Sequence, residues 1–132
     1  MEDNGQNAAE QLQEAVEVWR RAQVVQLTPS WRGEPLPSAL IELVAQRPEL
    51  EASLVALLSE TSQLVVAYAL VTLDRMSSAA LENLPEALLS RHDKIAVING
   101  SFSNTMELGG LARQISKRSR GGRGTKKHGA GA

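Results

Sequence analysis

The chain has 132 residues, of which 42% are hydrophobic and only 3% aromatic, so its core must be built mainly from Leu, Val, Ile and Ala. It contains no cysteine, which excludes disulfides, thiol nucleophiles and thiolate or iron–sulfur metal sites. Residues 1–112 hold all 15 carboxylates and 7 of the 14 Lys and Arg, for a charge of −8, whereas residues 113–132 hold the other 7 and no acid, for a charge of +7.

The N-terminal residues are acidic and rich in amides, and they lack the basic-then-apolar order of a secretory signal. The longest apolar run, residues 64–71, is much shorter than the roughly 20 residues that span a bilayer. We therefore expect a cytoplasmic protein without a membrane partner.

The first helix is predicted at residues 8–26, where Leu12, Val16 and Trp19 recur at helical spacing among charged residues. Residues 28–35 are rich in Pro and Gly and predict a loop. Trp31 in this loop is either an anchor in the protein's own core or a contact for a partner.

Two further helices are expected to begin at prolines, which suit the first turn of a helix. The apolar stripe of the earlier one consists of Leu36, Leu40, Leu43 and Val44. The later one begins at Pro48, ends at the polar residues 59–62 and carries Leu50, Leu54, Leu57 and Leu58.

A fourth helix, apolar nearly all round, is predicted from Thr61 or Ser62 to Met76. Its Val-rich part, residues 65–71, also fits a buried strand, because Val is β-branched. The helix is favoured because the apolar pattern continues to Met76 without an interior Gly or Pro. We expect this element to be the buried centre of the fold.

The last third of the chain carries weaker signals. Pro85 begins a short helix, and Asn-Gly between apolar runs at residues 94–103 indicates a small β-hairpin, with an irregular loop as the alternative. An isolated hairpin is marginal in water, so this one would have to lie on the helices or on another chain. A final helix is expected to begin at Asn104 or Thr105 and to reach Ile115.

Residues 116–128 contain no apolar side chain to bury, so the sequence predicts a helical domain at residues 1–115 and a flexible, disordered basic tail at residues 116–132. The cations of this region are candidate contacts for the phosphates of nucleic acid. They are Arg113, Lys117, Arg118, Arg120, Arg123, Lys126 and Lys127.

The centre of the chain shows the order of residues found in a family of helical repeats. Residues 54–58 end in paired leucines, residues 59–62 are a polar break, and residues 65–73 carry a Val, then small residues, then a Leu. This order resembles a HEAT-type repeat over about residues 48–84. The resemblance implies a small bundle of antiparallel helix pairs that acts as a binding scaffold and carries no chemistry of its own.

No residue pattern in the sequence predicts catalysis. His92-Asp93 is the only acid–histidine pair, but adjacent side chains diverge and no nucleophile motif accompanies them. Residues 101–105 either cap a helix or hold an anion, and two distant histidines do not form a metal site. We therefore expect no enzyme activity, no metal and no cofactor.

Two functions remain from the sequence. The first is a non-catalytic protein-interaction or adaptor module, with candidate partner contacts at Trp31, at Phe102 on the hairpin, and at Gly109 and Gly110. Such a glycine pair allows close approach of a backbone, either a partner's or the chain's own. The alternative is a nucleic-acid- or ribosome-associated protein that binds phosphates through its basic tail.

Overall fold

The computed structural model describes residues 4–26, 36–99 and 102–131, and the side chains of residues 8–25, 38–98 and 103–119. Within these ranges the chain is mainly helical, as predicted, with one small sheet. In chain order the elements are α1 (Asn4–Arg21), β1 (Val25–Gln26), α2 (Leu36–Ala45), the 3-10 helix η1 (Pro48–Leu50), α3 (Glu51–Leu57), α4 (Gln63–Arg75), the 3-10 helix η2 (Ala79–Asn83), α5 (Glu86–Leu89), β2 (Lys94–Asn99), β3 (Phe102–Glu107) and α6 (Leu108–Gly131).

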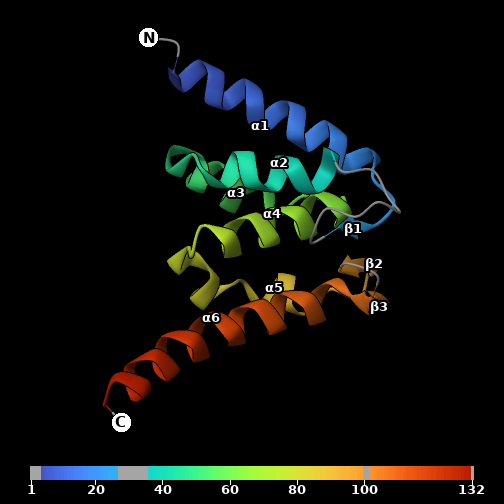
Figure 1. Cartoon of the computed structure of the whole chain (residues 1–132). Coiled ribbons are helices and arrows are strands. Elements are labelled where there is room, and N and C mark those ends of the chain that lie inside the picture. The colour runs from blue at the N-terminus through green and yellow to red at the C-terminus, as the bar shows by residue number, and fades with distance from the viewer. Residues whose placement is uncertain (1–3, 27–35, 100–101, 132) are drawn as a thin grey trace.

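The helices are stacked in nearly the order in which they occur in the chain (Figure 1). α1 packs on α2 and α4, and both α2 and α3 pack on α4. On the opposite side of α4, α6 packs on α4, η2 and α5. The acidic first helix and the basic last helix therefore lie at opposite ends of the stack.

α4 is the buried centre of the fold, as the sequence predicted. Every residue from Val65 to Leu73 is at most 5% exposed, and the whole segment is helical, so the alternative of a buried strand is wrong. The Ser62 hydroxyl accepts a hydrogen bond from the backbone N–H of Val65, which caps the helix start. The hydroxyl of Thr72 is also satisfied, because it donates to the carbonyl of Tyr68 at 2.7 Å.

An aromatic pair joins α1 to α4. The rings of Trp19 and Tyr68 are fully buried and stacked, with centroids 5.4 Å apart and planes 6° from parallel. The Tyr68 hydroxyl donates to the carbonyl of Val24 at 2.7 Å. Tyr68 therefore holds both the end of α1 and the segment that leads into β1.

The predicted C-terminal end of the first helix, at residue 26, is wrong. α1 ends at Arg21, and β1 pairs in parallel with β2, Val25 opposite Val97 and Gln26 opposite Ile98. Two successive β-branched valines favour extended backbone, and Val25 is fully buried in the sheet. Helical spacing within the segment could not reveal the partner strand, which lies far along the chain.

The hairpin is present, and the alternative of an irregular loop is wrong. β2 and β3 pair antiparallel from Lys94 opposite Glu107 to Asn99 opposite Phe102. The hairpin is longer than the predicted residues 94–103, so Asn104 and Thr105 lie in β3 and α6 begins only at Leu108. β1 supplies a third strand, which gives the hairpin the support that it needs.

The two predicted apolar stripes are confirmed in part, since Leu57 is only half-buried and the side chain of Leu36 lies outside the described residues. Leu50, Leu54 and Leu58 are buried, as expected. In α2, Ile41 is fully buried, whereas Leu43 is 45% exposed. The difference follows from the helical period, because Ile41 lies on the side of Leu40 and Val44 and residue 43 falls outside that stripe.

Contacts with the helical domain continue past Ile115, where the sequence predicts that the domain ends. Ser116 is buried, and the guanidinium of Arg118 lies 2.6 Å from the carboxylate of Asp74 on α4. Where the sequence predicted a disordered tail, the backbone of α6 continues as a helix to Gly131. Adding residues to an existing helix costs less free energy than forming a first helical turn, so a helix that is already packed favours the helical backbone of the residues that follow it.

The first turn of α6 packs closely on the end of α5 at Gly109. Gly109 is buried, and its N–H donates to the carbonyl of Arg91 at 2.8 Å. A Cβ added at residue 109 would lie 2.7 Å from that carbonyl oxygen and closer still to the carbonyl oxygen of Leu89. At Gly110 a Cβ would meet no atom within 4 Å. The backbone that approaches Gly109 closely is therefore that of residues 89–91 of the same chain.

This contrast predicts opposite effects for two identical substitutions. Gly109→Ala should lower the free energy of unfolding by about 2 kcal/mol, because two carbonyl groups must move. Gly110→Ala should be neutral or stabilise by up to about 1 kcal/mol, because alanine favours the helix. Urea unfolding of both variants measures this, and equal effects would show that the close packing at Gly109 is absent.

Candidate functional site

The described residues contain no arrangement that suits a metal ion or a membrane span. Nowhere among them do three His, Asp or Glu side chains gather in a geometry fit for a metal. None of the described helices combines the length and apolar character needed to cross a bilayer. Grooves and charged surfaces are the remaining candidate sites of the described residues.

The His92-Asp93 pair is not assembled as an acid–base pair. The His92 side chain is 82% exposed, and its Nδ1 lies 3.1 Å from Oε1 of Glu107. The partner of His92 is therefore Glu107 and not the neighbouring Asp93. The carboxylate of Asp93 instead accepts a hydrogen bond from Nε of Arg91 at 2.9 Å. This bond is the main reason that the pKa of Asp93 is lowered from its usual value.

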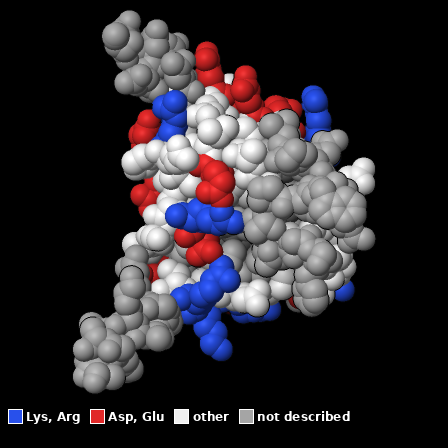
Figure 2. Space-filling model, in the orientation of Figure 1, with Lys and Arg blue, Asp and Glu red and all other residues white. Residues whose placement is uncertain are grey.

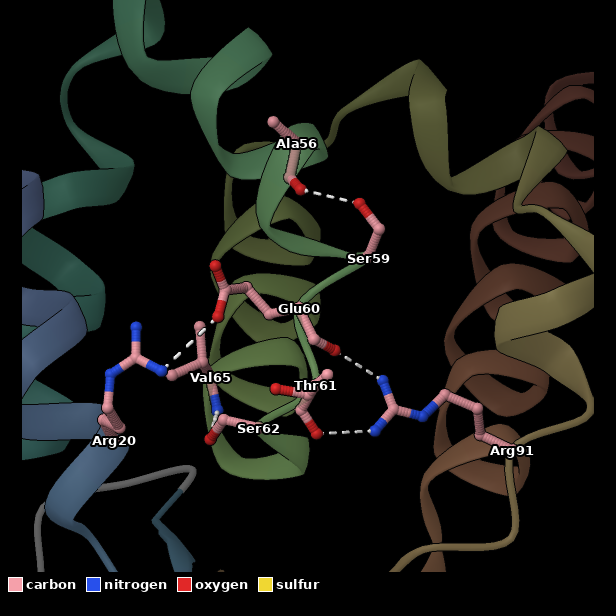
Figure 3. Close-up of polar contacts among 8 residues, drawn as sticks. All are labelled: Arg20, Ala56, Ser59, Glu60, Thr61, Ser62, Val65 and Arg91. Atoms are coloured by element: carbon pink, nitrogen blue, oxygen red, sulfur yellow. Dashed lines mark hydrogen bonds and ion pairs between the residues drawn. The ribbon is translucent and has the colours of Figure 1, made fainter.

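Arg91 joins two distant parts of the chain. Its Nη1 donates to the carbonyl of Glu60 at 2.7 Å and its Nη2 to the carbonyl of Thr61 at 2.9 Å (Figure 3). Its Nε donates to the carboxylate of Asp93. The planar guanidinium makes all three bonds at once. The turn between α3 and α4 is thereby fixed to the segment between α5 and β2.

The same turn is tied to α1 from its other side. The carboxylate of Glu60 lies 3.4 Å from the guanidinium of Arg20, and both side chains are about one-third or more exposed (Figure 3). An exposed pair of this kind contributes less than about 1 kcal/mol. Its main effect is geometric, because it closes one end of the gap between α1 and α3.

An open groove of about 590 Å³ lies between α1 and α3. α1 packs on α2, α4 and η1, and α3 packs on α4 and η1, so part of the apolar side of each faces this gap. The lining residues are Ala9, Glu10, Leu12, Gln13, Val16, Glu17 and Arg20 of α1, and Ser53, Ala56, Leu57 and Glu60 of α3 and the turn that follows it. Along α1 they cover about 16 Å, at a rise of about 1.5 Å per residue.

The groove has an apolar floor and an acidic rim. Leu12 is buried, Val16 and Leu57 are half-buried and Ala56 is exposed. Glu10 and Glu17 are exposed, and within the described part of the chain neither has an ion-pair partner, whereas Arg20 is paired with Glu60. Acidic side chains prevail around α1, and Lys and Arg prevail toward α6 (Figure 2).

A second hollow, on the other side of α1, is smaller and more polar. It measures about 300 Å³ and is lined by Gln11, Leu43, Gln46, Arg47 and Glu49. Arg47 already crosses it, because its Nε donates to the side chain of Gln11 at 2.6 Å. Because these polar side chains already bond to each other, this hollow is a poorer candidate for binding a partner than the groove between α1 and α3.

Of the sequence-predicted partner contacts, the structure describes the surroundings of Gly109 and Gly110. Trp31 lies outside the described residues, and Phe102 lies in β3 with its side chain outside them. Gly109 is buried, and Gly110 is half-buried with open space above it.

The sequence-predicted phosphate contacts all lie on α6. Arg113, Lys117 and Arg118 are exposed, but Arg113 donates to the carbonyl of Leu89 at 2.6 Å and Arg118 is paired with Asp74. The side chains of the other four lie outside the described part of the chain; these are Arg120, Arg123, Lys126 and Lys127.

The sequence pattern predicted three of the four residues of the groove floor as apolar stripe positions, but it did not predict the groove. Leu12, Val16 and Leu57 all belong to the predicted apolar stripes. A stripe shows which side of a helix is apolar, not whether a neighbouring helix covers it. Glu10 and Glu17 gave no signal beyond the acidity of the first helix.

No protein-family model, curated protein or solved structure matches this chain.

The bonds of Arg91 predict that a lysine cannot replace it. Arg91→Lys should lower the free energy of unfolding by about 2 kcal/mol, because one ammonium group cannot reach both carbonyls and Asp93 together. Arg20→Lys, a matched change in an exposed pair, should alter it by less than about 0.5 kcal/mol. Chemical denaturation compares them, and equal stability of the two variants would contradict this role of Arg91.

Proposed function

We propose that this protein is a non-catalytic protein-interaction module that binds a partner in the groove between α1 and α3. The observation that carries the proposal is the apolar floor of Leu12, Val16, Ala56 and Leu57 left open between two helices. Apolar grooves are a recurring place at which proteins bind segments of other proteins.

The arrangement of α3 and α4 supports the same proposal. The half-exposed α3 packs on α4, whose middle is buried, and a polar turn of a few residues connects the two helices. An outer helix on an inner one is the arrangement that the HEAT-type resemblance implies, and helical repeats serve as binding scaffolds. The resemblance remains part of the proposal.

A light-activated cross-linking residue tests the groove at matched positions. Placed at Ala56, which lines the groove, it should yield a discrete protein adduct in the native cells that survives nuclease treatment. Placed at Ala52, an equally exposed alanine on the same helix outside the groove, it should not. The same adduct at both positions, or none at Ala56 and at Gln13, would contradict the proposal.

A second candidate function is weak binding of nucleic acid by α6, and the segregation of charge favours it. Seven cations and no acid occur from residue 113 onward. Arg113 and Arg118 are already bonded within the fold, so the candidate phosphate contacts are the other five cations. Binding of this kind gains from the release of counterions and carries no sequence preference.

The salt dependence of binding measures this second candidate. If all five cations engaged a single strand, the slope of log affinity against log salt would be about −3.5, from roughly 0.7 for each phosphate contact. Exchanging Arg120, Arg123, Lys126 and Lys127 for Gln leaves one of the five cations and should reduce the slope to about −0.7. A labelled single-stranded oligonucleotide titrated at several salt concentrations gives both values. An unchanged affinity in the variant would rule out phosphate binding by the tail.

A further inference from the structure

We infer that the occupant of the groove between α1 and α3 is a basic amphipathic helix of a partner protein. The inference rests on the proposed function and adds the chemistry of the partner. It follows from the shape of the groove, from its apolar floor and from the charges along its rim.

The shape of the groove suits a helix. Two helices form its walls, and the lining residues extend for about three turns along α1, from Ala9 to Arg20. An amphipathic helix placed between them would present apolar residues at i, i+3, i+4 and i+7 to the floor. Those residues would contact Val16 and Leu57, whose partial exposure leaves apolar surface uncovered.

The rim selects the charge of that helix. Glu10 and Glu17 lie two turns apart on α1, and no described cation is paired with either of them. The one cation of the rim, Arg20, is already neutralised by Glu60. A helix with Lys or Arg beside its apolar stripe would pair with both free carboxylates, whereas an acidic helix would be repelled.

A second copy of this chain is a poorer occupant, although its α6 is basic. The apolar residues of α6 that could fill the floor are Leu108, Leu111, Ala112 and Ile115, and all four are at most 5% exposed because they pack on the chain's own core. From Ser116 to His128 the helix carries no apolar side chain. An external helix with its own apolar stripe fits the groove better.

Three designed helical peptides test the inference with the full-length protein. All three are labelled; the first has a leucine stripe flanked by Lys and Arg, the second has the same stripe flanked by Glu, and the third keeps the cations but has Ser in place of the leucines. Fluorescence anisotropy should show that the first peptide binds at least about tenfold more tightly than either of the others.

Matched variants locate the binding to the rim. Glu17→Lys should weaken the first peptide about fivefold, because an attraction becomes a repulsion at an exposed site. Glu14→Lys makes the same change on the same helix outside the groove and should leave the affinity within about twofold. Circular dichroism checks that both variants keep the fold.

Each alternative result of these binding experiments would overturn a specific part of the inference. Equal affinity for the acidic peptide would overturn the inferred charge but leave the groove as a binding site. Equal affinity for the peptide without leucines would mean simple charge attraction and would overturn the amphipathic helix. A self-association that Glu17→Lys abolishes would make a second copy the occupant. If none of the peptides bound and no adduct formed at Ala56, the proposed function itself would fail.

Discussion

The burial of the middle of α4 is the constraint on which the rest of the structure depends. Nine consecutive residues, from Val65 to Leu73, are hidden from solvent, so other elements must cover this helix on every side. α1, α2 and α3 do so on one side, and α6 and the sheet do so on the other. The stack of Trp19 on Tyr68 adds an aromatic contact at the centre, and the Tyr68 hydroxyl extends it to the segment before β1.

The covering helices are held at their ends by polar contacts rather than by packing alone. Arg91 fixes the turn after α3, and the Arg20–Glu60 pair ties the same turn to α1. The position of α3 is thus set by contacts that do not fill the space between α3 and α1. A groove held open in this way is preorganised, which reduces the entropy lost when a partner binds.

The two proposed surfaces differ in chemistry and lie apart. The groove is apolar with an acidic rim at the end of the stack formed by α1 and α3, and the cations of α6 belong to the opposite end. A basic helix and a nucleic acid carry opposite charges, so neither would compete for the surface of the other. The acidic and basic parts of the sequence thus place the two proposed surfaces at opposite ends of the stack.

The sequence by itself determined the features that depend on local spacing: the apolar helix α4, the stripe of Leu50, Leu54 and Leu58, and the hairpin around Asn99-Gly100. Tertiary structure alone decided that Val25 joins β2, that Leu43 stays exposed, that Arg91 holds the turn at Glu60 and Thr61, and that the floor beside Leu57 stays uncovered. Periodicity reports which side of an element is apolar. Whether another element covers that side depends on contacts between residues far apart in the chain, which local spacing does not record.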